Sequence, residues 1–139
     1  KILKENNFLI IIISNQSGVA RGFFSEEDVN KLHKWINLQL SKHKIKIDDF
    51  FFATELPDTE ILKTRRKPSP RMIEEAIEKY NLNRDDCFMI GDKHIDVMAA
   101  KNNSIKNSVA IKVPKSIAPN AMGNVWKINP GPAEFGSRS

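Results

Sequence analysis

The sequence is poor in cysteine and in long hydrophobic runs, and each shortage excludes a class of protein. Its one cysteine, Cys87, allows neither an internal disulfide nor a zinc site built from several cysteines, and it suits a reducing cytoplasm. The apolar runs are all shorter than the length that spans a bilayer. We therefore expect a cytoplasmic protein that does not act at a membrane, with Cys87 as a small core residue.

The charge balance is mildly basic and does not indicate a nucleic-acid binder. The 139 residues carry a formal net charge of +5, but the lysines are spread along the chain and do not alternate with aromatic residues. A small anionic substrate explains the same charge. With 40% hydrophobic and 28% charged residues, the composition is that of an ordinary globular domain. We also expect a monomer.

The chain is organised around residues 8–22, which predict a buried strand followed by a polar loop. The six apolar residues at 8–13 do not alternate with polar ones, a pattern typical of a parallel strand covered on both faces. Ser14, Asn15 and Ser17 follow at once, and Arg21 lies further along the loop. Ligands of open parallel sheets bind beyond the carboxyl ends of the strands, so these residues predict a site. An ordinary strand-to-helix turn is the alternative.

A helix and a second strand are predicted next. Ser25 followed by Asp28 is typical of a capped helix start, and apolar residues then recur at helical spacing up to Leu40. His33 and His43 have no acid or cysteine at ligand spacing, so we expect both at the surface or the boundary of this helix. Residues 49–54 predict a second short buried strand.

Three cations, at positions 65–67, precede a further predicted helix. Ser69 can cap this helix and Pro70 can occupy its first position. Since a helix N-terminus is already positive, cations placed before it predict a bound anion. A solvated charge run is the alternative.

Two carboxylates follow the third predicted strand, at residues 87–90. Asp92 and Asp96 are four residues apart where this strand leads into a helix, and oxygen ligands in such a place suit Mg²⁺. The alternative is a helix cap at Asp92 and a first-turn acid at Asp96. A last strand is predicted at residues 108–113, and residues 114–139 predict an irregular segment with an appended tail at 131–139.

These features together indicate phosphoryl transfer, and they resemble a known family. A hydroxyl, a lysine and a Mg²⁺-binding carboxylate on one rim can position a phosphoryl group and neutralise its charge. The stretches SNQSGVARGFF, RRKPSP and MIGDKHID resemble three motifs of the haloacid dehalogenase-like phosphatases. Within residues 8–113 the likeness is strongest to the branch that hydrolyses heptose 1,7-bisphosphate and histidinol phosphate.

The resemblance implies a fold and a role for each motif residue. The fold is an α/β, Rossmann-like three-layer parallel sheet, formed here by residues 1–113. Ser14 would hydrogen-bond the transferring phosphoryl group, Lys67 would neutralise its charge, and Asp92 would hold Mg²⁺ with Asp96 as a second acid of the metal site. The substrate-binding residues implied in the same way are Asn15, Ser17, Arg21, Arg66 and Lys93.

The sequence departs from the family in two places. Many members of this branch bind zinc in the loop before the RKP motif, but residues 55–64 contain neither cysteine nor histidine, so zinc is not expected. The family's nucleophile lies in an Asp-x-Asp motif on a central strand, between the strands that carry Ser14 and Asp92. No Asp-x-Asp occurs in the 139 residues. We therefore expect a sheet without its first central strand, an N-terminally incomplete domain, and a chain that is inactive by itself.

The function implied is Mg²⁺-dependent hydrolysis of a small sugar phosphate through an aspartyl-phosphate. Heptose 1,7-bisphosphate, a lipopolysaccharide precursor, is the expected substrate, with cleavage at C7. Histidinol phosphate is an alternative substrate, and a non-catalytic phosphate-binding module is an alternative function. A phosphatase of nucleic-acid ends would need a basic groove, for which the sequence has no pattern.

Overall fold

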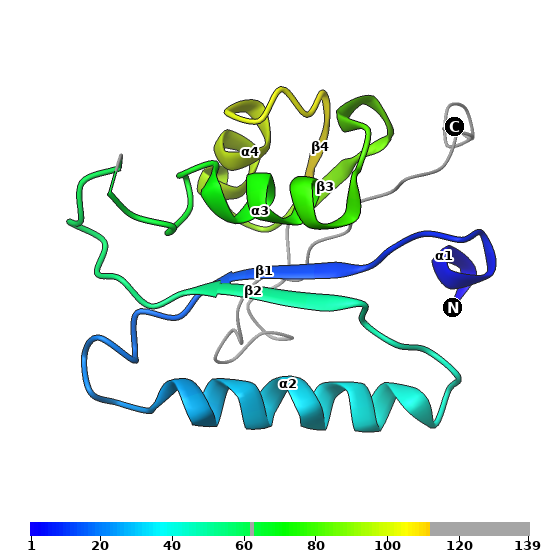
Figure 1. The fold of residues 1–139 in the computed structure, drawn as a ribbon, viewed down its shortest axis with the longest axis horizontal. Helices are drawn as coiled ribbons and strands as arrows, with labels where there is room; N and C mark the ends of the chain where they lie inside the picture. Colours follow the sequence, from blue (N-terminus) through cyan, green and yellow to red (C-terminus); the bar gives the residue numbers. More distant parts are fainter. Residues whose placement is uncertain (62, 112–139) are drawn as a thin grey trace.

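Two pairs of parallel strands carry the fold, and the computed structural model describes residues 1–61 and 63–111 (Figure 1). Strand β1 (Ile11–Asn15) pairs with β2 (Asp49–Ala53), and β3 (Phe88–Gly91) pairs with β4 (Asn107–Ala110). The helices are α1 (Ile2–Glu5), α2 (Glu26–Ser41), α3 (Arg71–Tyr80) and α4 (His94–Lys101), with a short 3₁₀ helix, η1 (Arg84–Asp86), before β3. No helix of the described segments is long and apolar enough to cross a bilayer.

Strand β1 is buried on both faces, as its apolar run predicts. Ile11 and Ile13 belong to a core shared with α3, β3 and α4, whereas Ile10 and Ile12 pack in a second core with residues of α2. Figure 1 shows α2 along one side of the β1–β2 pair and α3 along the other. Alternate side chains therefore enter different cores, which explains why no position in the run is polar.

The limits of β1 differ from those predicted from the sequence. The strand begins at Ile11, which pairs with Asp49 of β2. Before it, the Phe8 amide still donates to the Leu3 carbonyl as the chain leaves α1, and the Ile10 amide donates to the Asp48 side chain. The strand continues to Asn15, which pairs with Ala53 of β2. Ser14 and Asn15 are therefore the last residues of the strand and not the first residues of the loop.

Helix α2 begins as predicted, and α3 begins one residue later. The Ser25 hydroxyl accepts from the Asp28 amide at 3.1 Å, and the Asp28 carboxylate accepts from the Ser25 amide at 2.9 Å. For α3 the N-cap is Pro70 and not Ser69, because the Pro70 carbonyl accepts from the Ile73 amide at 3.0 Å. The prediction that Pro70 occupies the first helical position was wrong by one residue.

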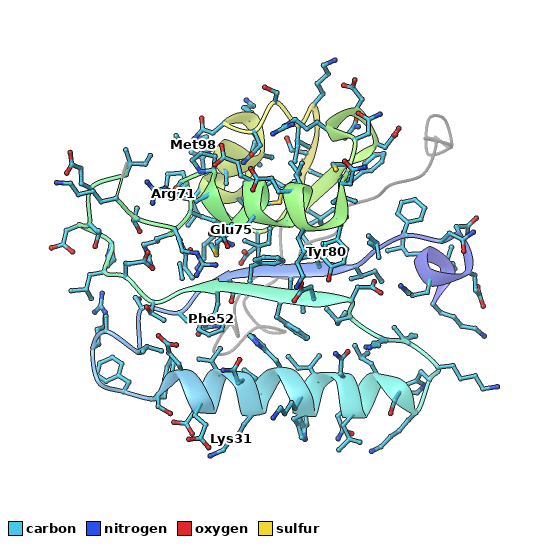
Figure 2. The ribbon with its side chains drawn as sticks, in the orientation of Figure 1. Lys31, Phe52, Arg71, Glu75, Tyr80 and Met98 are labelled. Atoms are coloured by element: carbon cyan, nitrogen blue, oxygen red, sulfur yellow. The ribbon has the colours of Figure 1, made fainter. Side chains whose placement is uncertain are left out.

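His33 is buried, so its predicted place at the surface or the boundary of the helix was wrong. Only 8% of the residue is exposed, and its ring stacks on Phe50 with 4.1 Å between centroids and 15° between planes. Phe52, which points from β2 toward α2 in Figure 2, meets the imidazole edge-on at 5.6 Å. Burial lowers the pKa of His33, so the folded protein favours the neutral ring. His43 is exposed, as predicted.

The two strand pairs remain separate sheets within the described residues. β1 pairs with β2 alone, and β3 pairs with β4 alone. The resemblance predicts a strand between β1 and the strand that leads to Asp92, which is β3. Each of the four strands has one neighbour in the described residues, so β1 and β3 both have an edge at which a further strand could pair. The last strand ends at Ala110, and the predicted segments beyond residue 111 lie outside the described part of the chain.

Candidate functional site

The carboxyl end of β1 is joined to the segment before α3 by one asparagine. Asn15 Oδ1 accepts from the Lys67 backbone amide at 2.9 Å, and Asn15 Nδ2 donates to the Lys67 carbonyl at 3.1 Å. The two residues are 52 positions apart in the sequence. Two of the three predicted motifs therefore meet through the side chain of a residue that the sequence predicted as a substrate contact.

Lys67 is a buried cation at the same place. Its Nζ donates to the Ile13 carbonyl at 2.9 Å and lies 2.9 Å from Asp96 Oδ1, and both charged side chains are 0% exposed. Burial lowers the pKa of Lys67 to about 8, although the Asp96 charge acts in the opposite direction. The third motif, on α4, thus joins the first two through this ion pair.

The other carboxylate oxygen of Asp96 forms a hydrogen bond at the N-terminus of α4. Asp96 Oδ2 accepts from the Lys93 backbone amide at 2.9 Å, which holds the turn that follows β3. The Ile13 carbonyl and the Lys93 amide are main-chain groups, which all residues except proline have in common. Their contacts with Lys67 and Asp96 therefore could not be predicted from the sequence.

The remaining predicted site residues differ in their exposure to solvent. Ser14 is buried, and its Oγ accepts from Gln16 Nε2 at 3.3 Å, while Ser17 is half-buried. Arg21, Asp92 and Lys93 are exposed. Asp92 and Lys93 both shift the pKa of Lys67, so they lie within electrostatic range of its ammonium group.

Arg66 carries a buried donor without a partner in the described part of the chain. Its Nη1 atom is shielded from solvent and makes no hydrogen bond there. The pKa of Arg66 is lowered first by burial and then by the charge of Arg21, whereas Glu55 opposes the shift. Two arginines close enough to repel each other, one with an unsatisfied N–H, form an arrangement that an anion would stabilise.

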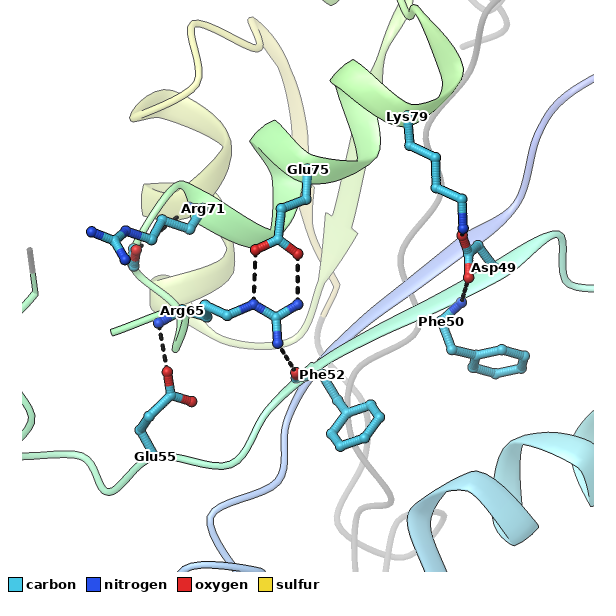
Figure 3. Close-up of polar contacts among 9 residues, drawn as sticks. Asp49, Phe50, Phe52, Glu55, Arg65, Arg71, Glu75 and Lys79 are labelled. Atoms are coloured by element: carbon cyan, nitrogen blue, oxygen red, sulfur yellow. Dashed lines mark hydrogen bonds and ion pairs between the residues drawn. The ribbon is translucent and has the colours of Figure 1, made fainter. Parts of the chain in front are cut away.

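Arg65, in contrast, is a structural residue (Figure 3). Its guanidinium group makes a two-pronged contact with Glu75 of α3 at 2.8 and 2.6 Å, and its Nη1 donates to the Phe52 carbonyl at 2.9 Å. Its backbone amide donates to Glu55 at 2.8 Å. The three cations at positions 65–67 therefore do not act as one anion-binding run, because Arg65 binds β2 to α3 and Lys67 is paired with Asp96.

The two acids predicted for a metal site also differ. Asp96 is held by Lys67 and by the Lys93 amide, whereas the Asp92 carboxylate is exposed beyond the end of β3. Within residues 1–61 and 63–111 no three His, Cys, Asp or Glu side chains are grouped as for a metal ion. Mg²⁺ keeps several waters and needs only one or two protein carboxylates, so Asp92 fits as its ligand.

Two surface hollows along β2 lie away from these residues. One of about 470 Å³ lies between α2 and β2, with His33 and Asn37 in its lining, and a smaller one of about 150 Å³ is bordered by Arg65. None of the predicted site residues lines either hollow. The candidate site is the polar rim at the ends of β1 and β3, where residues of the three motifs meet.

Comparison with known proteins gives the same family from sequence and from structure. A family model described as haloacid dehalogenase-like hydrolase matches residues 29–110. The D-glycero-beta-D-manno-heptose-1,7-bisphosphate 7-phosphatase of Pasteurella multocida (strain Pm70) is 34% identical over 119 residues, which cover 83% of this chain and 65% of that protein. The D-glycero-alpha-D-manno-heptose-1,7-bisphosphate 7-phosphatase of Photorhabdus laumondii is 35% identical over 117 residues, 81% of this chain and 64% of that protein.

A solved structure is similar over the same region. It is the crystal structure of D,D-heptose 1.7-bisphosphate phosphatase from B. bronchiseptica complexed with magnesium and phosphate. The TM-score is 0.66 at 27% sequence identity, and the match covers 72% of this chain and 55% of the solved chain. The chain thus spans just under two thirds of the two relatives' length and about half of the solved one.

Proposed function

The chain belongs to the haloacid dehalogenase-like hydrolase family, and from this premise we propose that it forms the phosphate-binding rim of a phosphoric monoester hydrolase. The observation that carries the proposal is Lys67, a fully buried cation that residues of β1 and α4 hold at the carboxyl ends of the strands. A desolvated, fixed cation stabilises developing phosphoryl charge far better than a hydrated one.

Each predicted residue then has a part in holding the phosphoryl group. The Ser14 hydroxyl donates to a phosphoryl oxygen, and the Lys67 ammonium offsets charge on the equatorial oxygens. Asp92 would hold Mg²⁺, which when bound supplies further charge neutralisation at the phosphate, and Asp96 supports the site by fixing Lys67. Arg21 and Arg66 contact the rest of the substrate, together with Ser17 and Lys93.

The attacking carboxylate has its place between β1 and β3 in this proposal. The sequence has no Asp-x-Asp, and β1 and β3 each lack a second neighbour in the described residues. A strand inserted there would carry an aspartate to the rim beside Ser14 and Lys67, where it would form the aspartyl-phosphate. The same strand would satisfy the backbone groups of both open edges.

The proposed substrate is D-glycero-D-manno-heptose 1,7-bisphosphate, hydrolysed at C7. Support comes from the names of the relatives and from the magnesium and phosphate in the solved structure. Two cationic places, Lys67 and the Arg21–Arg66 pair, also suit a substrate with two phosphates. We further propose that the protein is cytoplasmic, in keeping with the single cysteine, and that it is a monomer.

Phosphate release from heptose 1,7-bisphosphate with Mg²⁺ tests this function. We expect none from the 139 residues alone, and turnover from a protein in which an Asp-x-Asp strand precedes them. Lys67→Ala or Asp92→Ala in that protein should lower kcat/KM by at least about 100-fold, the typical effect of removing one electrostatic group from an active site.

Matched substitutions separate these effects from a general loss of charge. Lys63→Ala removes an exposed lysine of the same segment, and Asp85→Ala removes an exposed acid before β3, so neither should change the rate. Turnover by the 139 residues alone would refute the place given to the nucleophile. A fully active Lys67→Ala protein would refute the proposed role of the rim.

A further inference from the structure

The side chain of Asn15 is already engaged by the protein where a substrate contact was expected. Both of its polar atoms bond the backbone of Lys67, at 2.9 and 3.1 Å. We propose that Asn15 is a positioning residue that sets Lys67 in place and that it does not itself bind the substrate. This inference rests on the proposed function, since it explains how the phosphate-binding lysine is held.

The geometry attaches both ends of Lys67 to one strand. Asn15 fixes the lysine backbone, while the Ile13 carbonyl, two residues earlier on β1, accepts from Nζ at 2.9 Å. The backbone and the ammonium group of Lys67 are therefore held by two points of the same strand. Asp96 adds the counter-charge at 2.9 Å from Nζ, but it comes from a different element, α4.

An asparagine is suited to this task because its amide offers one acceptor and one donor side by side. Its Oδ1 accepts from the N–H and its Nδ2 donates to the C=O of one residue, as the backbone of a neighbouring strand would. A carboxylate in its place could accept from the Lys67 amide but would face the Lys67 carbonyl with a second acceptor. A serine is too short to present both groups.

The chain contains a second asparagine that makes the same pair of bonds away from the rim. Asn37 of α2 accepts from the Ile47 amide at 2.8 Å and donates to the Ile47 carbonyl at 3.2 Å. Both asparagines are half-buried, and the bond lengths match within 0.1 Å pair by pair. Asn37→Ala is therefore a control that removes the same interaction without touching Lys67.

The first test measures how accessible Lys67 becomes, with acetic anhydride labelling of the folded 139-residue chain followed by peptide mass spectrometry. Asn15→Ala should raise the labelling rate of Lys67 about tenfold, a factor that corresponds to about 1.4 kcal/mol of local opening. Asn37→Ala should leave the labelling rate of Lys67 unchanged. Both variants should lower the unfolding midpoint in urea by a similar amount, because each loses the same pair of bonds. Equal labelling of Lys67 in both variants would overturn the proposal.

The second test distinguishes positioning from direct contact with the ligand. Binding of inorganic phosphate in Mg²⁺ is measured by calorimetry for the unmodified chain, Asn15→Ala, Lys67→Ala and the double variant. A positioning role predicts that Asn15→Ala weakens binding only while Lys67 is present, so that the double variant equals Lys67→Ala alone. Additive losses would show that Asn15 touches the phosphate and would refute the inference.

The two tests also separate this inference from the proposed function. If the unmodified chain and every variant bind no phosphate, the proposed role of this rim fails in the 139 residues. The labelling experiment still decides whether Asn15 holds Lys67, because it needs no ligand. Two results together support the inference and the proposed function: Lys67 labelling rises in Asn15→Ala alone, and the losses of phosphate affinity in the two single variants do not add in the double variant.

Discussion

The carboxyl end of β1 and the segment just before its amino end are held by similar contacts in different surroundings. At the carboxyl end Lys67 bonds the Ile13 carbonyl and pairs with Asp96, whose second oxygen accepts from a backbone amide. At the amino end Lys4 bonds the Phe8 carbonyl at 3.1 Å and pairs with Asp48 at 2.7 Å. Asp48 likewise accepts from a backbone amide, that of Ile10, at 2.7 Å.

Burial is what separates the two ion pairs. The side chains of Lys4 and Asp48 are 27% and 20% exposed, whereas those of Lys67 and Asp96 are 0% exposed. A fully buried pair loses most of its hydration, and its attraction often no more than offsets that loss. The amino-end pair therefore serves to attach neighbouring segments, while the carboxyl-end pair holds a desolvated cation at the rim where we propose that a phosphate binds.

The largest effect is expected when the buried pair is broken. Asp96→Ala leaves the Lys67 ammonium buried without its carboxylate and the Lys93 amide without its acceptor. We expect a loss of about 3–5 kcal/mol in the free energy of unfolding, measured by urea denaturation. A loss below that of the amino-end variant would contradict the distinction between the two ends.

The amino-end pair should matter less. Asp48→Ala removes the partner of Lys4 and the acceptor of the Ile10 amide, but the Lys4 side chain is 27% exposed, so water can hydrate its charge. We expect a loss of about 1–2 kcal/mol in the same urea experiment, with no effect on phosphate binding. Weakened phosphate binding in this variant would show that the two ends are coupled through β1.

A smaller, pH-dependent effect should come from the α2 side of the sheet. Burial lowers the pKa of His33 in the folded protein below the value of about 6.5 expected for the unfolded chain. The unfolded chain therefore takes up the proton first, and the stability that the neutral ring provides is complete above pH 6.5 and declines as the pH falls below it.

Urea midpoints at pH 7.5 and pH 5.5 measure this contribution. His33→Phe should reduce the difference between the two midpoints relative to the unmodified chain. His43→Phe is the control, since His43 is exposed and should leave that difference as it is. An unchanged difference in His33→Phe would mean that the buried imidazole takes up its proton as easily as in the unfolded chain.

The smallest effect is expected from an ion pair on the open face of α2. Lys31 lies 3.0 Å from Glu27, but their side chains are 65% and 77% exposed. Such pairs are hydrated and screened, so Lys31→Ala should leave the urea midpoint unchanged within error. A measurable loss would show that burial is not what ranks the ion pairs of this protein.

Much of the secondary structure could be predicted because its signals are local. The continuous apolar run predicts β1 with two covered faces, and Ser25 with Asp28 predicts the start of α2. The strand at 49–54 and the start of α3 also lie within a residue or two of their predicted positions. Each depends on the spacing of neighbouring residues, which hydrogen bonding and burial translate directly into structure.

The site could be predicted only in part. Ser14, Lys67 and Asp96 were found as parts of separate motifs, but their roles in binding and catalysis remain predictions. The run of cations at 65–67 suggested one anion-binding patch, yet Arg65 faces Glu75 and β2. His33 was predicted at the surface or boundary of its helix, because the residues of α2 carry no sign that the ring stacks on Phe50 of β2.

The sequence by itself determined the kind of fold, the order of its elements and the residue types that can bind a phosphate, since these depend on short-range patterns and on chemistry. Only the tertiary structure decided which cation is buried, which acid is bound to it and which asparagine holds it. The partners of Lys67 lie 29 to 54 positions away along the chain, and only folding brings them within hydrogen-bond range.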